Sequence, residues 1–245
     1  MKSSLEKGLK IVFETNRYPA LLRKGGLNQM ESRWDSSMLI EINMAFDNAG
    51  KKKGDLPLSP FKVTENGLHD FRGFQLAVPL VRLNIKNSDF SWTTCRFGGS
   101  LNNCIFEDSI FRFSNFDGYF FVKQFQRCDL AGISIKNGSL SDSIFIECDF
   151  SEAKLTSAMA RGAKFIRCNF EKTNFSKGGF DFCLFEDCVF KGAKFKNTTM
   201  IGNTYIGERP EFKPSENVML TSRTEEMTLQ EAERLFFSML KDDDD

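Results

Sequence analysis

Cysteine is the residue of this 245-residue chain with the most evident chemistry, because its thiol binds metals, forms disulfides and acts as a nucleophile. Each of the seven cysteines stands two positions before an apolar residue: Cys95, Cys104, Cys128, Cys148, Cys168, Cys183 and Cys188. On an extended segment, positions i and i−2 point to the same side. The spacing therefore predicts small core residues beside larger ones, so we expect neither a metal site nor a redox pair.

The other chemistry-bearing residues lack partners at a productive spacing. His69 is the only histidine, and Asp70 is its one evident neighbour for acid–base work. The acidic pairs Glu107–Asp108 and Glu186–Asp187 fall where a charged outer surface is expected. The lysine loop at residues 50–54 lacks the glycine spacing and the Ser/Thr of a phosphate-binding loop. We therefore expect no catalytic residue, no cofactor and no enzyme activity.

A five-residue repeat positions all these side chains. From Phe125 to Tyr205 every fifth residue is apolar, and the positions two before these centres are mostly small. The register continues upstream through Phe90, Phe97, Leu101, Phe106, Phe111, Phe116 and Phe121. A straight strand cannot hold an odd period, because successive centres would point to opposite faces. The chain must turn a corner in each repeat, and a succession of corners winds it into a coil.

The number of repeats per coil follows from a longer period. Cys128, Cys148, Cys168 and Cys188 recur every twenty residues, and the column of positions before them alternates in sign: Asp108, Arg127, Glu147, Arg167 and Asp187. Four repeats per coil would stack these charges about 4.8 Å apart as an outward ladder of opposite signs. A step of fifteen residues gives no such alternation. The pattern predicts four-sided coils, and about six of them at this rise.

This organisation resembles the pentapeptide-repeat family, and the segments RCDLAG, ECDFSEAKL, RGAKFIRCNFEKTNF and EDCVFKGAKF carry the likeness. The resemblance implies an all-β fold, a right-handed quadrilateral β-helix (β-solenoid). The residue before each centre is often Asp or Asn in the family. Here it is apolar at Ile105, Ile110, Ile144, Leu184 and Val189.

The chain divides into three parts. Residues 1–80 lack the repeat and form an N-terminal cap or flanking segment, with a helix expected near Ser37–Asp47. Residues 81–207 form the β-helix. Residues 208–245 form a linker, a C-terminal amphipathic α-helix and an acidic tail, because a capping box at Thr228–Glu231 precedes apolar residues at helical spacing.

The apolar face of that C-terminal helix consists of Leu229, Leu235, Phe236, Met239 and Leu240. The ends of a solenoid expose strand edges and core, so they need covering. This face would be buried on the end of the solenoid, on a second copy in a homodimer, or on a partner. In quinolone-resistance members of the family a comparable helix pairs two subunits, so the resemblance implies a dimer to be tested.

A second apolar surface is predicted on the outside of the solenoid. Around the centres Phe125, Phe145, Phe165 and Phe185, the outward neighbours form a candidate interface: Ile144, Ile146, Ile166, Phe182, Leu184 and Ile206. An exposed apolar strip marks an interaction site unless the chain covers it. The N-terminal segment, the final helix, a partner protein and a second copy all remain candidates. Phe113, Tyr119 and Phe120 form a smaller patch of the same kind.

Charge and composition narrow the function. Residues 80–207 carry 16 basic and 13 acidic side chains and show no continuous basic stripe, so direct nucleic-acid binding is not expected. No stretch reaches transmembrane length, so we expect no membrane contact and a cytoplasmic protein. The first hypothesis is a rigid, non-enzymatic scaffold for another protein. The resemblance implies the second, a protector or inhibitor of type II topoisomerase (DNA gyrase), although a near-neutral rod disfavours DNA mimicry.

Overall fold

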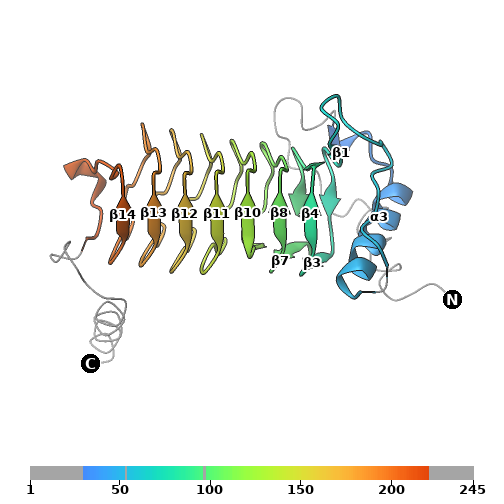
Figure 1. Ribbon diagram of the computed structural model, residues 1–245, viewed down its shortest axis with the longest axis horizontal. Helices are drawn as coiled ribbons and strands as arrows, with labels where there is room; N and C mark the ends of the chain where they lie inside the picture. The colour runs from blue at the N-terminus through green and yellow to red at the C-terminus, as the bar shows by residue number, and fades with distance from the viewer. Residues whose placement is uncertain (1–29, 53, 96–97, 221–245) are drawn as a thin grey trace.

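The computed structural model describes residues 30–52, 54–95 and 98–220. Its strands are short and parallel, and they stack coil upon coil along one axis with helix α3 (Ser36–Gly50) beyond one end (Figure 1). The strands are β1 (His69–Asp70), β2 (Gln75–Leu76), β3 (Pro79–Val81), β4 (Asn84–Lys86), β5 (Ser88–Asp89), β6 (Thr94–Cys95), β7 (Ser100–Asn102), β8 (Ile105–Glu107), β9 (Phe120–Phe121), β10 (Gln124–Gln126), β11 (Ile144–Ile146), β12 (Lys164–Ile166), β13 (Leu184–Glu186) and β14 (Thr204–Ile206). The fold is the all-β, quadrilateral solenoid that the repeat predicts.

Each coil has four sides, which we call faces A to D in chain order. Face A is a seven-stranded sheet in the order β14-β13-β12-β11-β10-β8-β4. Face B begins with the pair β1 and β5, face C with β2 and β6, and face D with β3, β7 and β9. Isolated parallel bridges continue faces B to D, for example Asp149 to Asn169 and Lys154 to Asn174. Faces A and C therefore lie on opposite sides of the solenoid.

Most corners have a left-handed backbone at the second residue after the centre. Along the corner between faces A and B, φ is +50° at Arg127, +53° at Glu147 and +51° at Arg167. This conformation is uncommon for residues other than glycine. It is tolerated here because the coils on both sides hold the backbone by hydrogen bonds, such as Arg127 N–H to the Ile146 carbonyl oxygen (2.8 Å).

On faces B and C the residue before the centre can form a side-chain turn. On faces B and C, Asp149 and Asn174 each accept a hydrogen bond from the N–H two residues on, at 2.9 Å and 3.0 Å. Such Asx turns favour a tight bend. Face A forms strands whether this residue is apolar, as at Ile144 and Leu184, or charged, as at Lys164. The sheet on this side therefore does not depend on the departure from the family pattern.

The centres form the core as predicted. On face A, the rings of Phe145 and Phe165 stack with their centroids 5.1 Å apart and 9° between their planes, and Phe165 and Phe185 repeat this at 5.1 Å and 12°. All these rings are buried. Offset stacking of this kind adds about 0.5–1.5 kcal/mol per pair to the burial of apolar area.

The small residues two before the centres also have a polar role. Ser143 and Thr173 donate their hydroxyls to the carbonyl oxygens of Val122 and Phe150, at 2.7 Å and 2.6 Å. The Cys183 thiol lies 2.6 Å from the Ala160 carbonyl oxygen. A buried carbonyl without a partner is costly, so this position favours small side chains that can donate.

The solenoid is longer than the sequence predicts. Parallel pairing already begins at His69, upstream of the expected boundary at residue 81, because β1 pairs with β5. Face A carries seven strands, one per coil, against the six coils expected. The five-residue period is hard to recognise in the first coils, because insertions interrupt it and apolar residues other than Phe occupy the centres.

Two register assignments were wrong. Phe121 was expected as a centre, but Phe120 pairs with Leu101 and is fully buried, whereas Phe121 is 47% exposed. Val122 is also buried, at 5% exposed, and its carbonyl oxygen accepts the Ser143 hydroxyl from the next coil. Cys95 stands at a central position, paired with Leu76, and not two before a centre.

Helix α3 closes the N-terminal end, which confirms the helix expected near Ser37–Asp47. The Phe46 ring lies 5.6 Å from that of Phe71 in the first coil. The buried Asn43 amide donates to the Gln75 carbonyl oxygen (3.0 Å) and accepts from the Ala77 N–H (2.8 Å). These bonds satisfy backbone groups that would otherwise pair with a preceding coil.

The C-terminal end is covered by the segment that the sequence analysis treats as a linker. The Phe212 ring packs edge-on against Phe195 (5.1 Å). Within the 3₁₀ turn η1 (Pro214–Glu216), the Glu216 carboxylate accepts the Phe195 N–H (3.0 Å). The predicted helix with Leu229, Leu235, Phe236, Met239 and Leu240 lies outside the described residues.

The stacked core makes a stability prediction. Phe170 is fully buried and stacks on Phe150 (5.2 Å) and Phe190 (5.5 Å). Phe170→Ala should lower the free energy of unfolding by about 3–5 kcal/mol, because it removes a ring and leaves a cavity. Denaturant melts measure the loss. The exposed Phe113→Ala serves as a control, and a loss below about 1 kcal/mol for Phe170→Ala would contradict the inward assignment.

Candidate protein interface

The predicted apolar strip lies on face A. Ile144 and Ile146 flank the buried centre of β11, and Ile146 pairs directly with Ile166 of β12. Leu184 stands in the row of Ile144, one coil beyond Lys164, and all four apolar side chains are half-buried. Since their central neighbours point inward, these side chains point outward. We call Ile144, Ile146, Ile166 and Leu184 the isoleucine strip.

Two residues of the predicted interface, Ile206 and Phe182, lie apart from the isoleucine strip. Ile206 on β14 shares the row of Ile146 and Ile166 but is separated from them by Glu186, and it is 50% exposed. Phe182 does not belong to the strip. It occupies the corner before β13 with φ +56°, is 9% exposed, and lies 4.9 Å beneath the Arg161 guanidinium.

Within the described part of the chain, no helix lies over the strip. Helix α3 packs on β3 at the N-terminal end, and residues 208–219 cover the last coil. Figure 1 shows the strands of face A side by side with α3 beyond β4. Of the covers considered from sequence, the described N-terminal segment is therefore excluded.

The smaller patch has a different composition from the one expected. Phe113 and Tyr119 are 51% and 46% exposed, as predicted, but Phe120 is buried and Phe121 takes its place outside. The sequence contains a sign of this register shift, because the centres Phe106 and Phe125 are separated by 19 residues and not 20. Such a shortened coil requires a shift of register nearby.

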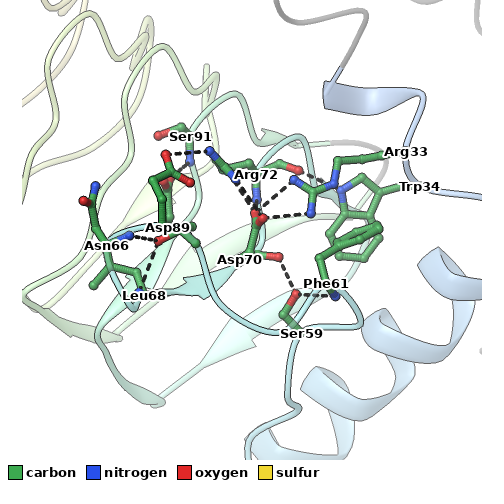
Figure 2. Close-up of polar contacts among 12 residues, drawn as sticks. Arg33, Trp34, Ser59, Phe61, Asn66, Leu68, Asp70, Arg72, Asp89 and Ser91 are labelled. Atoms are coloured by element: carbon green, nitrogen blue, oxygen red, sulfur yellow. Dashed lines mark hydrogen bonds and ion pairs between the residues drawn. The ribbon is translucent and has the colours of Figure 1, made fainter.

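The densest polar cluster lies where the N-terminal cap meets the first coil (Figure 2). Asp70 accepts hydrogen bonds from Arg33 (2.9 and 3.1 Å) and from the side chain of Arg72 (2.9 and 3.0 Å). Trp34 donates its indole N–H to the Arg72 carbonyl oxygen (2.8 Å), and Arg33 lies 3.6 Å above the Phe61 ring. The cluster thus ties three segments together.

The electrostatics of this cluster suit a structural role. Burial alone would raise the pKa of Asp70, but the hydrogen bonds from Arg72 and Arg33 outweigh it and hold that pKa below its usual value. Burial raises the pKa of neighbouring Asp89, whose oxygen accepts the Ser91 N–H (2.9 Å). The oxygens of Asp70 face arginines and not His69, so the acid–base pair considered from sequence does not form.

The cysteines line the interior. Burial raises the pKa of the Cys104 thiol to about 11 and that of Cys183 further above its usual value. A protonated thiol is a poor nucleophile and metal ligand. Among the described residues, no three His, Cys, Asp or Glu side chains gather as a metal site, and no helix is long and apolar enough to cross a bilayer.

The charge ladder forms as two separate pairs. Arg127 contacts Asp108 (2.7 Å), and Arg167 contacts Glu147 (2.9 Å). Asp108 is half-buried and the other three side chains are exposed at the corner between faces A and B, so solvent screening keeps the contribution of each pair to stability small.

Comparison with known proteins agrees with this geometry. The family model described as pentapeptide repeats matches residues 124–158 and 158–192, with eight copies of the repeat. No curated protein matches the chain by sequence.

Several solved structures are similar. A trypsin-treated form of QnrB1, a plasmid-mediated fluoroquinolone resistance protein, is 18% identical over 50% of this chain and 74% of its own, with a TM-score of 0.31. HetL, a pentapeptide repeat protein involved in heterocyst differentiation regulation from the cyanobacterium Nostoc, is 16% identical over 54% of this chain and 62% of its own, with a TM-score of 0.23. Rfr23 from the cyanobacterium Cyanothece is 15% identical over 50% and 87%, with a TM-score of 0.18. At these levels the comparisons say nothing of partner or activity.

The Asp70 cluster makes a pH-dependent prediction. A carboxyl whose pKa is lowered in the folded state stabilises the fold above its unfolded pKa, and this contribution is lost as the pH falls through the folded pKa. Asp70→Asn should therefore cost about 3 kcal/mol near neutral pH. The difference from the wild type should narrow below about pH 4.

Asp129→Asn is the matched control, because Asp129 holds the same position on face B but pairs with the exposed Arg112 (2.6 Å). It should cost less than about 1 kcal/mol in the same denaturant melts. Equal losses for the two variants at neutral pH would refute a special role for Asp70.

Proposed function

The chain belongs to the pentapeptide-repeat family, and we propose that it is a non-enzymatic scaffold that binds another protein through the isoleucine strip on face A. The observation that carries this proposal is the flat sheet of face A, whose outward isoleucines lie uncovered by any described element. A sheet face of this kind offers shape and apolar contact without a pocket.

The stacked core supports such a role because it makes the surface rigid. The Phe145, Phe165 and Phe185 rings lie in register beneath the strip. The strands above them are paired in register through Ile146 and Ile166. A preorganised surface loses little conformational entropy on binding, which favours affinity from a small contact area.

Charged residues lie beside the apolar side chains of the strip, a basic one in one row and an acidic one in the other. Lys164 lies between Ile144 and Leu184, and Glu186 lies beyond Ile166. Charged residues around an apolar centre contribute to specificity and association rate more than to affinity. The partner should therefore present an apolar patch flanked by one acidic and one basic group.

The strip is tested by Ile146→Lys/Ile166→Lys. These side chains point outward, so the variant should keep the thermal melt of the wild type while placing two charges in the interface. Quantitative pull-down from lysate of the native host should recover a protein with the wild type and lose it with the variant. Ala131→Lys/Ser151→Lys is the matched control, because it changes the equivalent row on face B in adjacent coils, and it should retain the protein.

The proposal fails if the double variant recovers the same proteins in the same amounts as the wild type. The proposal also fails if the control Ala131→Lys/Ser151→Lys loses the recovered proteins as completely as the strip variant does, because binding would then depend on overall charge and not on the strip.

The alternative is protection or inhibition of DNA gyrase. The outer surface carries lysines and arginines as well as carboxylates, which disfavours a mimic of DNA, and only an action without mimicry stays open. We expect purified chain to leave gyrase supercoiling and drug-induced cleavage unchanged at up to about tenfold molar excess, because the solenoid lacks the acidic field that would steer it to a nucleic-acid site. A change in either assay would move the alternative ahead of the scaffold.

A further inference from the structure

Lysines gather on the side of the solenoid opposite the isoleucine strip. Over the last three coils, face C and its corners carry six exposed lysines: Lys154, Lys172, Lys177, Lys191, Lys194 and Lys196. We call these six residues the lysine face. They are scattered along the sequence, and only the coiling brings them to one side.

The lysine face is a compact arrangement. Lys154 and Lys194 occupy the same row, with Asn174 between them, so they stand two coils or about 10 Å apart. Lys194 and Lys196 flank the buried centre Phe195, and Lys177 stands at the corner of the coil before.

The charge of the lysine face is mostly uncompensated. In the described residues only Lys172 of the six is in an ion pair, with Glu171 (3.4 Å). Glu152 is the other carboxylate beside Lys172 along this corner, and Glu216, whose carboxylate accepts the Phe195 N–H (3.0 Å), is a third at the end of the face. Six positive and three negative side chains leave a local charge of +3, as much as the whole of residues 80–207. A concentrated positive surface of this kind attracts an anionic partner.

The same chain supplies a segment of opposite charge. Residues 221–245 contain three basic and eight acidic side chains, a net charge of −5, and end in Asp242–Asp245. This segment follows Leu220, beside the last coil, where the Met200 N–H donates to the Met219 carbonyl oxygen and the Asn197 N–H to the Glu216 carbonyl oxygen. Eight extended residues span up to roughly 26 Å. The acidic segment therefore reaches every lysine of the face.

Tethering and surface chemistry favour this occupant over a nucleic acid. A short tether holds the acidic segment at an effective concentration of about a millimolar. Over the last three coils, the described side chains of face C include no exposed aromatic ring on which a base would stack. The six cations are all lysines, which act as point charges and lack the fork of arginine that binds phosphate in two places.

We propose that the lysine face is the docking surface of the chain's own acidic segment, residues 221–245. Docking would cover the side of the solenoid away from the isoleucine strip and leave face A open. The contact is electrostatic and therefore depends on ionic strength.

Carbodiimide cross-linking of the full chain tests this, because it joins a carboxylate and an amine that are in direct contact. At about 0.02 M salt, peptide mapping of the monomer should find most links from Asp242–Asp245 on Lys154, Lys177, Lys194 and Lys196, and few on the exposed Lys123 and Lys164 of other faces. These links should disappear at about 1 M salt, where the screening length is about 3 Å.

The variant Lys194→Glu/Lys196→Glu removes two amines that could be cross-linked, so its informative result is the yield of links to the lysines that remain. Links to the unchanged Lys154 and Lys177 should fall by about threefold or more, because the two substitutions lower the local charge of the face by four. Lys123→Glu/Lys164→Glu, with the same charge change on other faces, should leave these links unchanged.

An even spread of links over all exposed lysines would overturn the proposal. So would links confined to cross-linked dimers, because the acidic segment would then bind a second copy. Undiminished links to Lys154 and Lys177 in Lys194→Glu/Lys196→Glu would overturn it as well.

Discussion

The whole structure depends on one constraint, the corner that the backbone turns every five residues. The second residue after most centres adopts a left-handed conformation, even where it is a β-carbon-bearing residue such as Glu147 or Arg167. Isolated chains populate this conformation poorly. Only stacking makes it stable, because each inner coil donates N–H groups to, and accepts them with its carbonyls from, the coils on both of its sides.

The same dependence explains the ends. A coil in the middle is held from both sides, whereas a terminal coil lacks one set of partners. At the N-terminal end, Asn43 replaces a strand with its side-chain amide, and Asp70 binds two arginines that anchor the cap. At the C-terminal end, Glu216 performs a similar task with its carboxylate. Polar side chains that a sequence motif search would examine for catalysis thus complete the hydrogen bonding of the solenoid.

The four faces share one core and differ outside. An Asp or Asn before the centre makes a tight turn in coils of faces B and C, whereas face A is a continuous sheet of seven strands. Since the inward positions are set by packing, functional differences can only reside in the outward rows and corners. The isoleucine strip and the lysine face are two such rows, on opposite sides of one rigid rod.

The sequence by itself determined the repeat, the four-sided coil, the inward Phe residues and the outward direction of Ile144, Ile146, Ile166 and Leu184. A period is a local property, and hydrophobic burial enforces it in every coil. It also predicted the helix now seen as α3, from apolar spacing alone.

Only the tertiary structure decided what depends on neighbours in the next coil. Phe120 and not Phe121 is buried because its pairing with Leu101 of the preceding coil selects the register at a shortened coil. Phe182 is covered because Arg161, one coil away, stacks on it. Asp70 meets Arg33 across 37 residues, and six lysines dispersed over forty residues become one surface. These contacts join residues that are distant in sequence, and no local pattern records them.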